Sequence, residues 1–373
     1  MPEGYRRPAR VGFDSVKSRI SAPASRFSRS NRVSGFAFLG HSAGFGINQT
    51  LIPYDESSTY ARVFVVGLLN TLLLAGLGIV FATVLGFLVG IGRLSSNWLV
   101  ARIAGGYVEL IRNLPLLFQI LFWYLGVLSV LPLPRQAISI FGLTFLSVRG
   151  LEVPMLQPAE GMIYVASAFA FGLVATLAEG VRLKRLRERT GRQATLVWRA
   201  LMLMGALPLV VFIAAGAPVM LDVPRLEGFN FVGGARMKPE FLALLIALTT
   251  YTAAFIAEVV RAGILAVPRG QIEAAAALGL RQGQVLRFVL IPQALRIIVP
   301  PLTNQYLNLT KNTSLGVSIG YPDLFAVFAG TAANQTGQPI EIIGITMLVY
   351  LALSLATSML MNWYNARVRL TER

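Results

Sequence analysis

Residues 258–318 read EVVRAGILAVPRGQIEAAAALGLRQGQVLRFVLIPQALRIIVPPLTNQYLNLTKNTSLGVS. This segment begins in one apolar stretch and ends in another, and each stretch is long enough to cross a bilayer. Between them lie charged residues, two short helical patterns and a glycine, which is more structure than a connecting loop requires. We interpret residues 258–292 as a surface for a soluble partner and residues 293–318 as the membrane helix that this partner moves.

The composition places most of the chain in lipid. Its 373 residues are 55% hydrophobic and 13% charged, with a mean hydropathy of +0.65, whereas soluble domains contain about 25% charged residues. The sequence has no cysteine and one histidine, His41. These counts exclude disulfides, thiolate or paired-histidine metal sites, and catalytic triads that need an imidazole. We therefore expect no catalytic residue, no metal and no cofactor.

The hydrophobic pattern predicts an all-α, polytopic membrane protein. Residues 1–62 form a basic, polar arm, residues 63–363 form the membrane domain, and residues 364–373 form a cytoplasmic tail. A polar loop that contains prolines is predicted at 133–160, on the outer side. The predicted spans are seven: Val63–Gly92, Tyr107–Pro132, Gly161–Gly180, Trp198–Leu221, Phe241–Val260, Ile297–Ile319 and Ile340–Trp363.

The distribution of Lys and Arg sets the orientation and explains the net charge of +16 without nucleic acid. After residue 63, the loops assigned to the cytoplasm contain 18 basic residues and the outer loops contain five, as the positive-inside bias requires. The arm contradicts this topology, because seven spans place it outside although eight basic residues fall within residues 6–32. The explanations are an additional early span, a dip of Ser34–Gly46 into the membrane, or translocation of the arm.

Residues 271–292 predict a compact knob on the cytoplasmic side. Four consecutive alanines after Glu273 favour a helix, and Gly279 ends it because glycine tolerates a positive φ. A second short amphipathic helix, Gln282–Leu290, is predicted to stop at Pro292. Such a knob can sit in a cleft of a partner protein and carry force as a rigid body. The alternative is an interfacial helix that lies on lipid.

The knob resembles the cytoplasmic EAA loop of ABC importer permeases. That motif is E-A-A, three residues, G, nine residues, an aliphatic residue, one further residue, and aliphatic-Pro. It stands here as Glu273, Ala274, Ala275, Gly279, Val289, Ile291 and Pro292. Valine and isoleucine replace the isoleucine and leucine of the commonest form. The resemblance implies that a coupling helix in the loop at about 258–296 docks in a groove of an ATPase subunit.

Further motifs narrow the resemblance. RNLPLLFQILFWY (Arg112–Tyr124) and NLTKNTSLGVSIG (Asn308–Gly320) are similar to polar amino acid permeases, and Gly46–Leu74 is similar to the larger, general L-amino acid permeases. The resemblance covers about residues 35–373. It implies a type I, MetI-like permease fold with five core spans and an addition of two spans at about 161–221. Relatives of the larger type usually start with one more membrane helix.

The resemblance also implies the partners. Two permeases would pair around a central path, a periplasmic binding protein would deliver an L-amino acid, and an ATPase would drive alternating access across the bacterial inner membrane. The sequence contains no G-x-x-x-x-G-K-[ST] phosphate loop, so ATP binding would belong to a separate subunit. Membrane lipid is the remaining expected partner.

Polar residues in the sixth predicted span indicate where the path lies, because polar groups in lipid are costly and mark functional sites. Asn304, Asn308 and Lys311 are spaced four and three apart, so they share one face of a helix. Lys311 either attracts a substrate carboxylate or pairs with Glu109 or with a carboxylate of the second permease.

Other polar residues are assigned to the path or to its supports. Thr313 and Ser314 lie just beyond the lysine, and Asn113 and Gln119 in the second span are predicted to face the same path. The spacing of Glu109 and Arg112 favours an ion pair within one helix. Glu258 and Arg261 are expected to anchor the cytoplasmic loop.

An ion-coupled secondary transporter for amino acids or other small polar solutes is the alternative function. It predicts paired inverted repeats with broken helices in both halves, and the two halves of this sequence do not match. A membrane-embedded hydrolase would need catalytic side chains within the spans, and the predicted spans contain no histidine and no pair of aspartates. The subunit of an ATP-driven importer is therefore the preferred interpretation.

Overall fold

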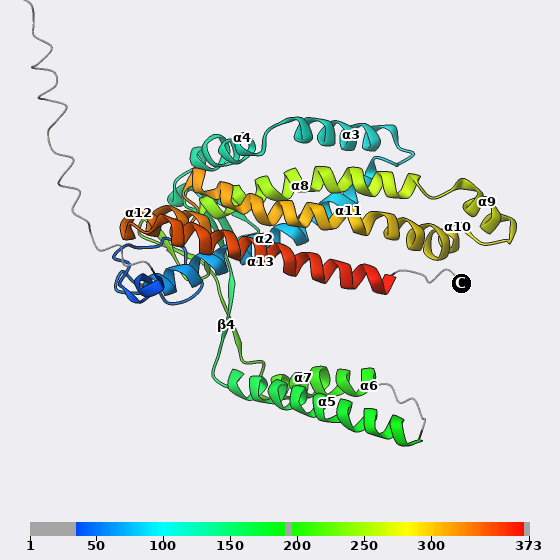
Figure 1. Cartoon of the computed structure of the whole chain (residues 1–373), viewed down its shortest axis with the longest axis horizontal. Helices are drawn as coiled ribbons and strands as arrows, with labels where there is room; N and C mark the ends of the chain where they lie inside the picture. The colour runs from blue at the N-terminus through cyan, green and yellow to red at the C-terminus, as the bar shows by residue number, and fades with distance from the viewer. Residues whose placement is uncertain (1–34, 191–195, 369–373) are drawn as a thin grey trace, which may run out of the picture.

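The computed structural model describes residues 35–190 and 196–368. Its body is a bundle of long helices that run side by side in Figure 1. Within the described residues, five helices are long and apolar enough to cross a membrane, or six if one bent pair counts as a span. The main helices of the body are α2 (Tyr60–Gly92), α8 (Pro239–Leu265), α11 (Ile291–Asn312) and α13 (Pro339–Val368).

Helix α8 lies at the centre of the bundle. In its most apolar 18-residue segment, 67% of the residues are buried, compared with 28% or less in the other spans. Glycines allow α2 to approach it closely. A Cβ atom at Gly86 would lie 2.6 Å from Cβ of Ile256, and one at Gly90 would lie 2.8 Å from Cβ of Val260. Small residues at such positions let helix backbones pack together in membranes. This packing makes α8 the element that α2 and α11 share.

The second predicted span is a bent pair of helices and starts earlier than expected. Helix α3 (Trp98–Asn113) begins after Asn97, whose side-chain oxygen accepts hydrogen bonds from the backbone N–H groups of Leu99 and Val100. The chain then bends by 108° before α4 (Leu116–Leu121), which continues as η3 (Phe122–Val127) and η4 (Leu128–Val130). The bend falls at Leu114, which is extended because it precedes a proline.

Short strands occupy the polar loop that was predicted at 133–160 and the segment that follows the fourth predicted span. An antiparallel sheet has the strand order β1-β2-β3-β8, and two further pairs are β4-β5 and β6-β7. The predicted fourth span was too long at its end, because residues 219–221 belong to β5. The strands are β1 (Ile138–Ile140), β2 (Thr144–Ser147), β3 (Gly150–Val153), β4 (Met155–Pro158), β5 (Val219–Asp222), β6 (Arg225–Glu227), β7 (Asn230–Val232) and β8 (Ala235–Met237), with η5 (Pro134–Gln136) before them.

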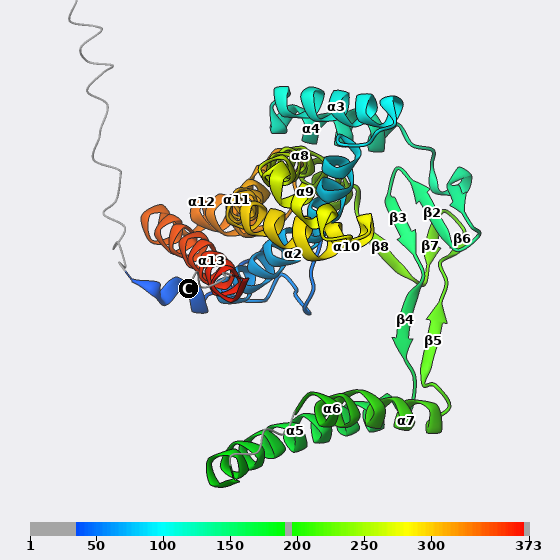
Figure 2. The same ribbon diagram turned by 90° about the vertical axis from the view of Figure 1, so that its right-hand side faces the viewer.

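The predicted additional spans form a hairpin that stands apart from the body, joined to it by β4 and β5 (Figure 2). Gly172 lies against the backbone carbonyl of Leu203, and Glu179 forms ion pairs with Arg199 and Arg182. Its second arm, Trp198–Ala214, is shorter than the other spans. The elements of the hairpin are α5 (Met162–Thr190), α6 (Leu196–Leu201), η6 (Met202–Ala206) and α7 (Leu207–Ala214).

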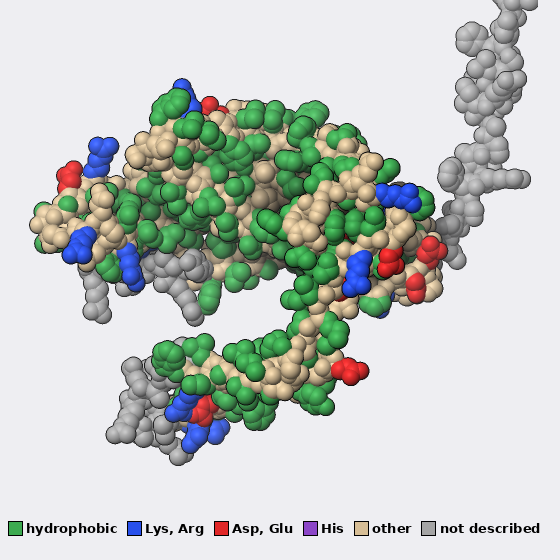
Figure 3. Space-filling model, turned by 180° about the vertical axis from the view of Figure 1, so that it is seen from behind, with side chains coloured by type: hydrophobic (Ala, Val, Ile, Leu, Met, Phe, Trp, Pro, Cys, Tyr) green, Lys and Arg blue, Asp and Glu red, His purple; other side chains and the backbone are tan. Residues whose placement is uncertain are grey.

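The two ends of the body differ in charge and structure. Figure 3 shows mostly Lys and Arg side chains, with an acidic side chain among them, at one end of the body and at the tip of the hairpin, and acidic and basic side chains together at the opposite end. The opposite end holds η2 (Phe36–Gly40), η8 (Thr313–Ile319), η9 (Phe325–Ala332) and α12 (Ala333–Thr336). Within the segment predicted to dip into the membrane, the described part begins with this short 3-10 helix, Phe36–Gly40. Most basic residues of the predicted arm, and residues 369–373 of the predicted tail, lie outside the described residues.

Candidate functional site

A knob of short helices projects from the basic end of the body, beyond α8 and α11 (Figure 1). Helix α9 (Arg269–Ala277) forms its first half. Helix α10 (Gln282–Val285) and a π-helical turn, η7 (Leu286–Leu290), form its second half. The structure thus has two helices joined at a glycine, as the sequence predicts.

Gly279 makes the turn between the two halves. Its φ of +78° is accessible to glycine at little cost. The N–H group of Gly279 donates to the carbonyl of Ala276 at 2.9 Å, and the N–H group of Leu280 donates to the carbonyl of Ala275 at 3.2 Å. These two bonds form a Schellman motif, which satisfies the last free carbonyls of α9 and fixes the direction of the following chain.

The EAA residues do not all face outward. Glu273, Ala274 and Gly279 are exposed, whereas Ala275 is buried inside the knob. At the tip, Leu278 is 82% exposed. A cavity of about 450 Å³ lies between the two halves, lined by Ile272, Ala276, Leu280, Gln282, Val285, Leu286 and Leu290.

Pro292 does not stop the second helix, contrary to the prediction. Helix α10, the π-helical turn η7 and α11 follow one another without a break, and Pro292 is in the first turn of α11. Inside a continuous helix, a proline leaves one carbonyl of the preceding turn without its usual N–H donor. The π-helical turn before it changes the hydrogen-bond register locally. The knob is therefore continuous with the sixth span, which runs from Gln282 to Ile319.

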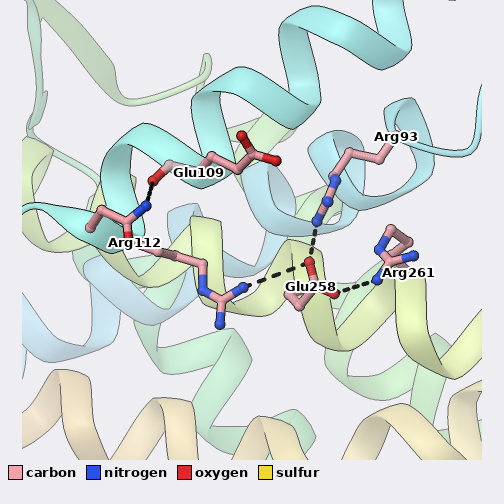
Figure 4. Close-up of polar contacts among 6 residues, drawn as sticks. Arg93, Glu109, Arg112, Glu258 and Arg261 are labelled. Atoms are coloured by element: carbon pink, nitrogen blue, oxygen red, sulfur yellow. Dashed lines mark hydrogen bonds and ion pairs between the residues drawn. The ribbon is translucent and has the colours of Figure 1, made fainter.

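Three arginines from different helices surround one carboxylate at the base of the knob (Figure 4). We call this group the Glu258 cluster; it comprises Glu258 with Arg93, Arg112 and Arg261. Arg261 donates to one carboxylate oxygen at 2.6 Å, and Arg93 pairs with the other. The guanidinium of Arg112 lies 3.7 Å from that second oxygen. The expectation that Glu258 and Arg261 form an anchor is met by their contact, and the sequence did not indicate the other two arginines.

Glu109 does not pair with Arg112, although their spacing predicts it. Figure 4 shows the Glu109 carboxylate pointing away while the Arg112 guanidinium reaches toward Glu258. Arg112 also lies over the ring of Phe255, 5.1 Å from its centroid. Glu109 is exposed, so the desolvated carboxylate of α8 offers Arg112 the stronger interaction.

The predicted polar face of α11 exists. Asn304, Asn308 and Lys311 are all exposed along one side of the helix, whereas Leu302 and Leu309 on the other side are buried. Among the described residues, Lys311 forms neither an ion pair with Glu109 nor one with any other carboxylate. Lys311 lines a cavity of about 350 Å³ together with Phe325, Ala329, Ile343, Thr346, Met347, Tyr350, Leu351 and Ser354.

The side chains of Thr313 and Ser314 bond to backbone carbonyls and are not part of this exposed face. Thr313 is fully buried and donates to the carbonyl of Thr310 at 2.9 Å. Ser314 is partly buried and donates to the carbonyl of Lys311 at 2.8 Å. Both hydroxyls therefore satisfy backbone groups where α11 tightens into a 3-10 helix.

Asn113 and Gln119 support the bend between α3 and α4. Asn113 donates to the carbonyl of Glu109 at 2.8 Å. The buried amide of Gln119 donates to the carbonyls of Ile111 and Leu114, each at 3.0 Å. Those carbonyls have lost their helical partners at the bend, so Gln119 supplies the missing donors.

A buried polar network lies near the opposite end; the sequence predicts interhelix hydrogen bonds for Asn70 and Thr71, whereas the aspartate of the network, Asp323, was not predicted. Asn70 donates to the carbonyl of Pro322 at 2.8 Å, and Thr71 accepts from the N–H group of Leu324 at 3.0 Å. Asp323 accepts from the N–H group of Ala326 and caps η9. Burial raises the pKa of Asp323 to about 6. An aspartate placed between a proline turn and an apolar run was the available signal for this cap.

The apolar bundle defines a multi-pass membrane protein from which a knob of short helices projects at one end. The profile of the family described as "Binding-protein-dependent transport system inner membrane component" matches residues 78–370. The chain belongs to this family, and the predicted ABC importer permease fold of type I is confirmed.

Several proteins are similar along most of the chain. The general L-amino acid transport system permease protein AapQ of Rhizobium johnstonii is 52% identical over 350 residues, which cover 94% of this chain and 87% of the relative. The putative amino-acid ABC transporter permease protein YhdX of Escherichia coli is 54% identical over 345 residues, covering 91% and 86%. A solved amino acid ABC transporter with histidines has a TM-score of 0.49 at 22% identity, covering 83% of this chain and 95% of that chain.

Proposed function

We propose that this chain is the membrane-spanning permease subunit of an ATP-driven importer of polar or general L-amino acids in the bacterial inner membrane. Membership of the family supports the transport role. The names of the relatives that match nearly the whole chain support amino acids as the substrate class. The observation that carries the proposal is the knob, because its exposed EAA residues lie on a rigid element that continues directly into a membrane helix.

The knob would dock on a separate ATPase subunit. Glu273, Ala274 and Gly279 offer a charge and a shallow surface, and Leu278 offers an exposed apolar anchor between them. Apolar anchors in a polar surround dominate the affinity of many interfaces. Ala275 and Pro292 would act from inside, since one packs beneath the surface and the other joins the knob to α11.

The polar face of α11 would line the translocation path. Asn304, Asn308 and Lys311 are left uncovered by their own chain, and exposed polar groups in a span are expensive in lipid. A second permease subunit packed around this face would enclose a polar path and remove that cost. Movement of the knob would then move α11 relative to the second subunit, which gives alternating access, and a binding protein would deliver the amino acid from outside.

Reconstitution tests this proposal. The chain is expressed with candidate ATPase, second permease and binding protein subunits, and copurification of the ATPase and ATP-dependent amino acid uptake into vesicles are measured. Glu273→Ala and Gly279→Val are expected to reduce both, the latter because valine resists positive φ. Asn362→Ala, an exposed change on α13 outside the knob, serves as the control. Uptake that continues without any ATPase would refute the proposal and favour an ion-coupled transporter.

A further inference from the structure

The Glu258 cluster gathers the ends of three helices at one carboxylate. Arg93 is the C-terminal cap of α2, Arg112 is in the last turn of α3, and Arg261 is one turn beyond Glu258 on α8. Cations at the C-terminal ends of α2 and α3 are also favoured by the helix dipoles. A single side chain of α8 is thus tied to the ends of α2 and α3.

The cluster lies immediately before the knob. Helix α8 ends at Leu265, two turns beyond Glu258, and α9 begins at Arg269 after a tight connection. Val267 in that connection is buried against the core formed by α2, α8 and α11. A displacement of α9 therefore reaches the end of α8 without a flexible linker to absorb it.

The three ion pairs are unequal. Arg93 and Arg261 each hold one oxygen of the carboxylate, whereas Arg112 shares an oxygen with Arg93 at the longer distance of 3.7 Å. Arg112 is also the most exposed of the three, at 40%, compared with 17% for Arg93. Three positive groups around one negative group repel one another. The ion pair between Arg112 of α3 and Glu258 of α8 is consequently the weakest of the three and the first to break.

The remaining attachments of α3 leave room for such a movement. Val108 packs against Ala254 and Ala257 of α8, and the hydroxyl of Tyr107 donates to the carbonyl of Thr250 at 2.6 Å. These contacts lie along one side of α3, and its other sides carry exposed residues.

We propose that Glu258 is a positioning residue that transmits movement of the knob to α2 and α3. This inference rests on the proposed ATP-driven function. With Glu258 in place, the ends of α2 and α8 move as one unit. Helix α3 moves with them while its longer ion pair holds, and it separates when that pair breaks. Without the carboxylate, the knob still binds the ATPase and α2 still packs on α8 through Gly86 and Gly90, but the displacement is passed less completely to α3.

The test measures coupling rather than assembly. Glu258→Gln in the assembled transporter is expected to lower ATP-dependent uptake about tenfold, in the range typical of coupling between sites, while ATPase copurification and ATP hydrolysis persist. Glu258→Asp is expected to recover part of the uptake, because it restores the charge. Glu179→Gln is the matched control, since Glu179 also binds two arginines but belongs to the hairpin.

A second variant distinguishes a loss of coupling from misfolding of the chain. Arg112→Gln leaves the pairs of Glu258 with Arg93 and Arg261 intact and is expected to lower uptake less than Glu258→Gln. Unchanged uptake in Glu258→Gln, or a parallel loss of uptake, ATPase binding and ATP hydrolysis in both variants, would overturn the inference. Failure of the unmodified chain to bind an ATPase would instead refute the proposed function itself.

Discussion

The hydroxyl of Tyr350 donates a hydrogen bond of 3.1 Å to Oδ2 of Asp323, and this bond ties α13 to the buried turn before η9. The Asp323 carboxylate is fully buried, and its partners are a hydroxyl and backbone N–H groups rather than a cation. A buried carboxylate with neutral partners favours its protonated form. The turn is therefore held by a group whose charge state depends on pH.

Asp323→Asn should stabilise the protein at neutral pH. Burial raises the pKa of Asp323 from 3.8 to about 6, so its stabilising contribution is present below pH 3.8 and is lost as the pH rises through 6. The ionised form costs up to about 3 kcal/mol at pH 7. We expect the melting temperature of the variant to exceed that of the unmodified protein increasingly between pH 4.5 and 7. A difference that does not vary with pH would contradict this prediction.

Gly86→Val should weaken the contact between α2 and α8. A Cβ atom at Gly86 would lie 2.6 Å from Ile256, so valine forces the helices apart at a cost of about 1–3 kcal/mol. Thermal unfolding in detergent measures the loss. Gly76→Val on the same helix is the control, because no atom lies within 4 Å of its added Cβ. Equal melting temperatures for the two variants would show that the close approach is unimportant.

Leu278→Ala should weaken binding of the proposed ATPase without destabilising the chain. Leu278 is 82% exposed at the tip of the knob, so its own fold loses little. Interface anchors typically contribute more than about 1 kcal/mol each, which corresponds to a several-fold weaker Kd. Ile340→Ala is a matched control, since Ile340 is also 82% exposed but lies at the other end of the body. The same Kd for both variants would exclude Leu278 as an anchor.

Lys311→Gln should reduce amino acid uptake while ATPase binding is retained. Hydrogen bonds to charged groups contribute about 1.5–3 kcal/mol, so loss of a substrate contact would lower uptake about tenfold or more. Arg102→Gln removes an exposed charge from α3 and serves as the control. Full uptake by the Lys311 variant would place the path elsewhere on the molecule.

Local rules predicted the knob well because its turn depends on a single residue. The glycine two residues after the four alanines specifies where α9 ends, and the backbone hydrogen bonds at Gly279 are those of a helix that ends at a glycine. The continuation through Pro292 depends instead on the π-helical turn before it, which has no comparable signal in the sequence. The outer strands are only three or four residues long, too short for a reliable alternating pattern.

Polar residues within spans were harder to assign. Asn304, Asn308 and Lys311 could be placed on one face from their spacing alone. Gln119 is likewise a polar residue in an apolar span, but its side-chain amide donates hydrogen bonds to the carbonyls of Ile111 and Leu114. The partner of Arg112 could not be predicted from the sequence either. Glu258 is 146 residues away along the chain and contacts Arg112 only because α3 packs on α8. Tertiary contacts, rather than local spacing, decided these roles.

The pairing of β3 with β8 makes the hairpin a detachable module. Val153 and Ala235 are opposite each other in the antiparallel sheet, and Glu152 pairs with Arg236 beside them. The whole segment from residue 154 to residue 234 therefore leaves and re-enters the body at neighbouring points. Strands β4 and β5 are paired up to Pro158 and Val219, so a short turn of about two residues can replace residues 159–218, and the hairpin can be excised, exchanged or tagged while Phe231 stays stacked on Phe145 of the sheet. The architecture thus separates a replaceable accessory from a transport body that is complete in its own packing.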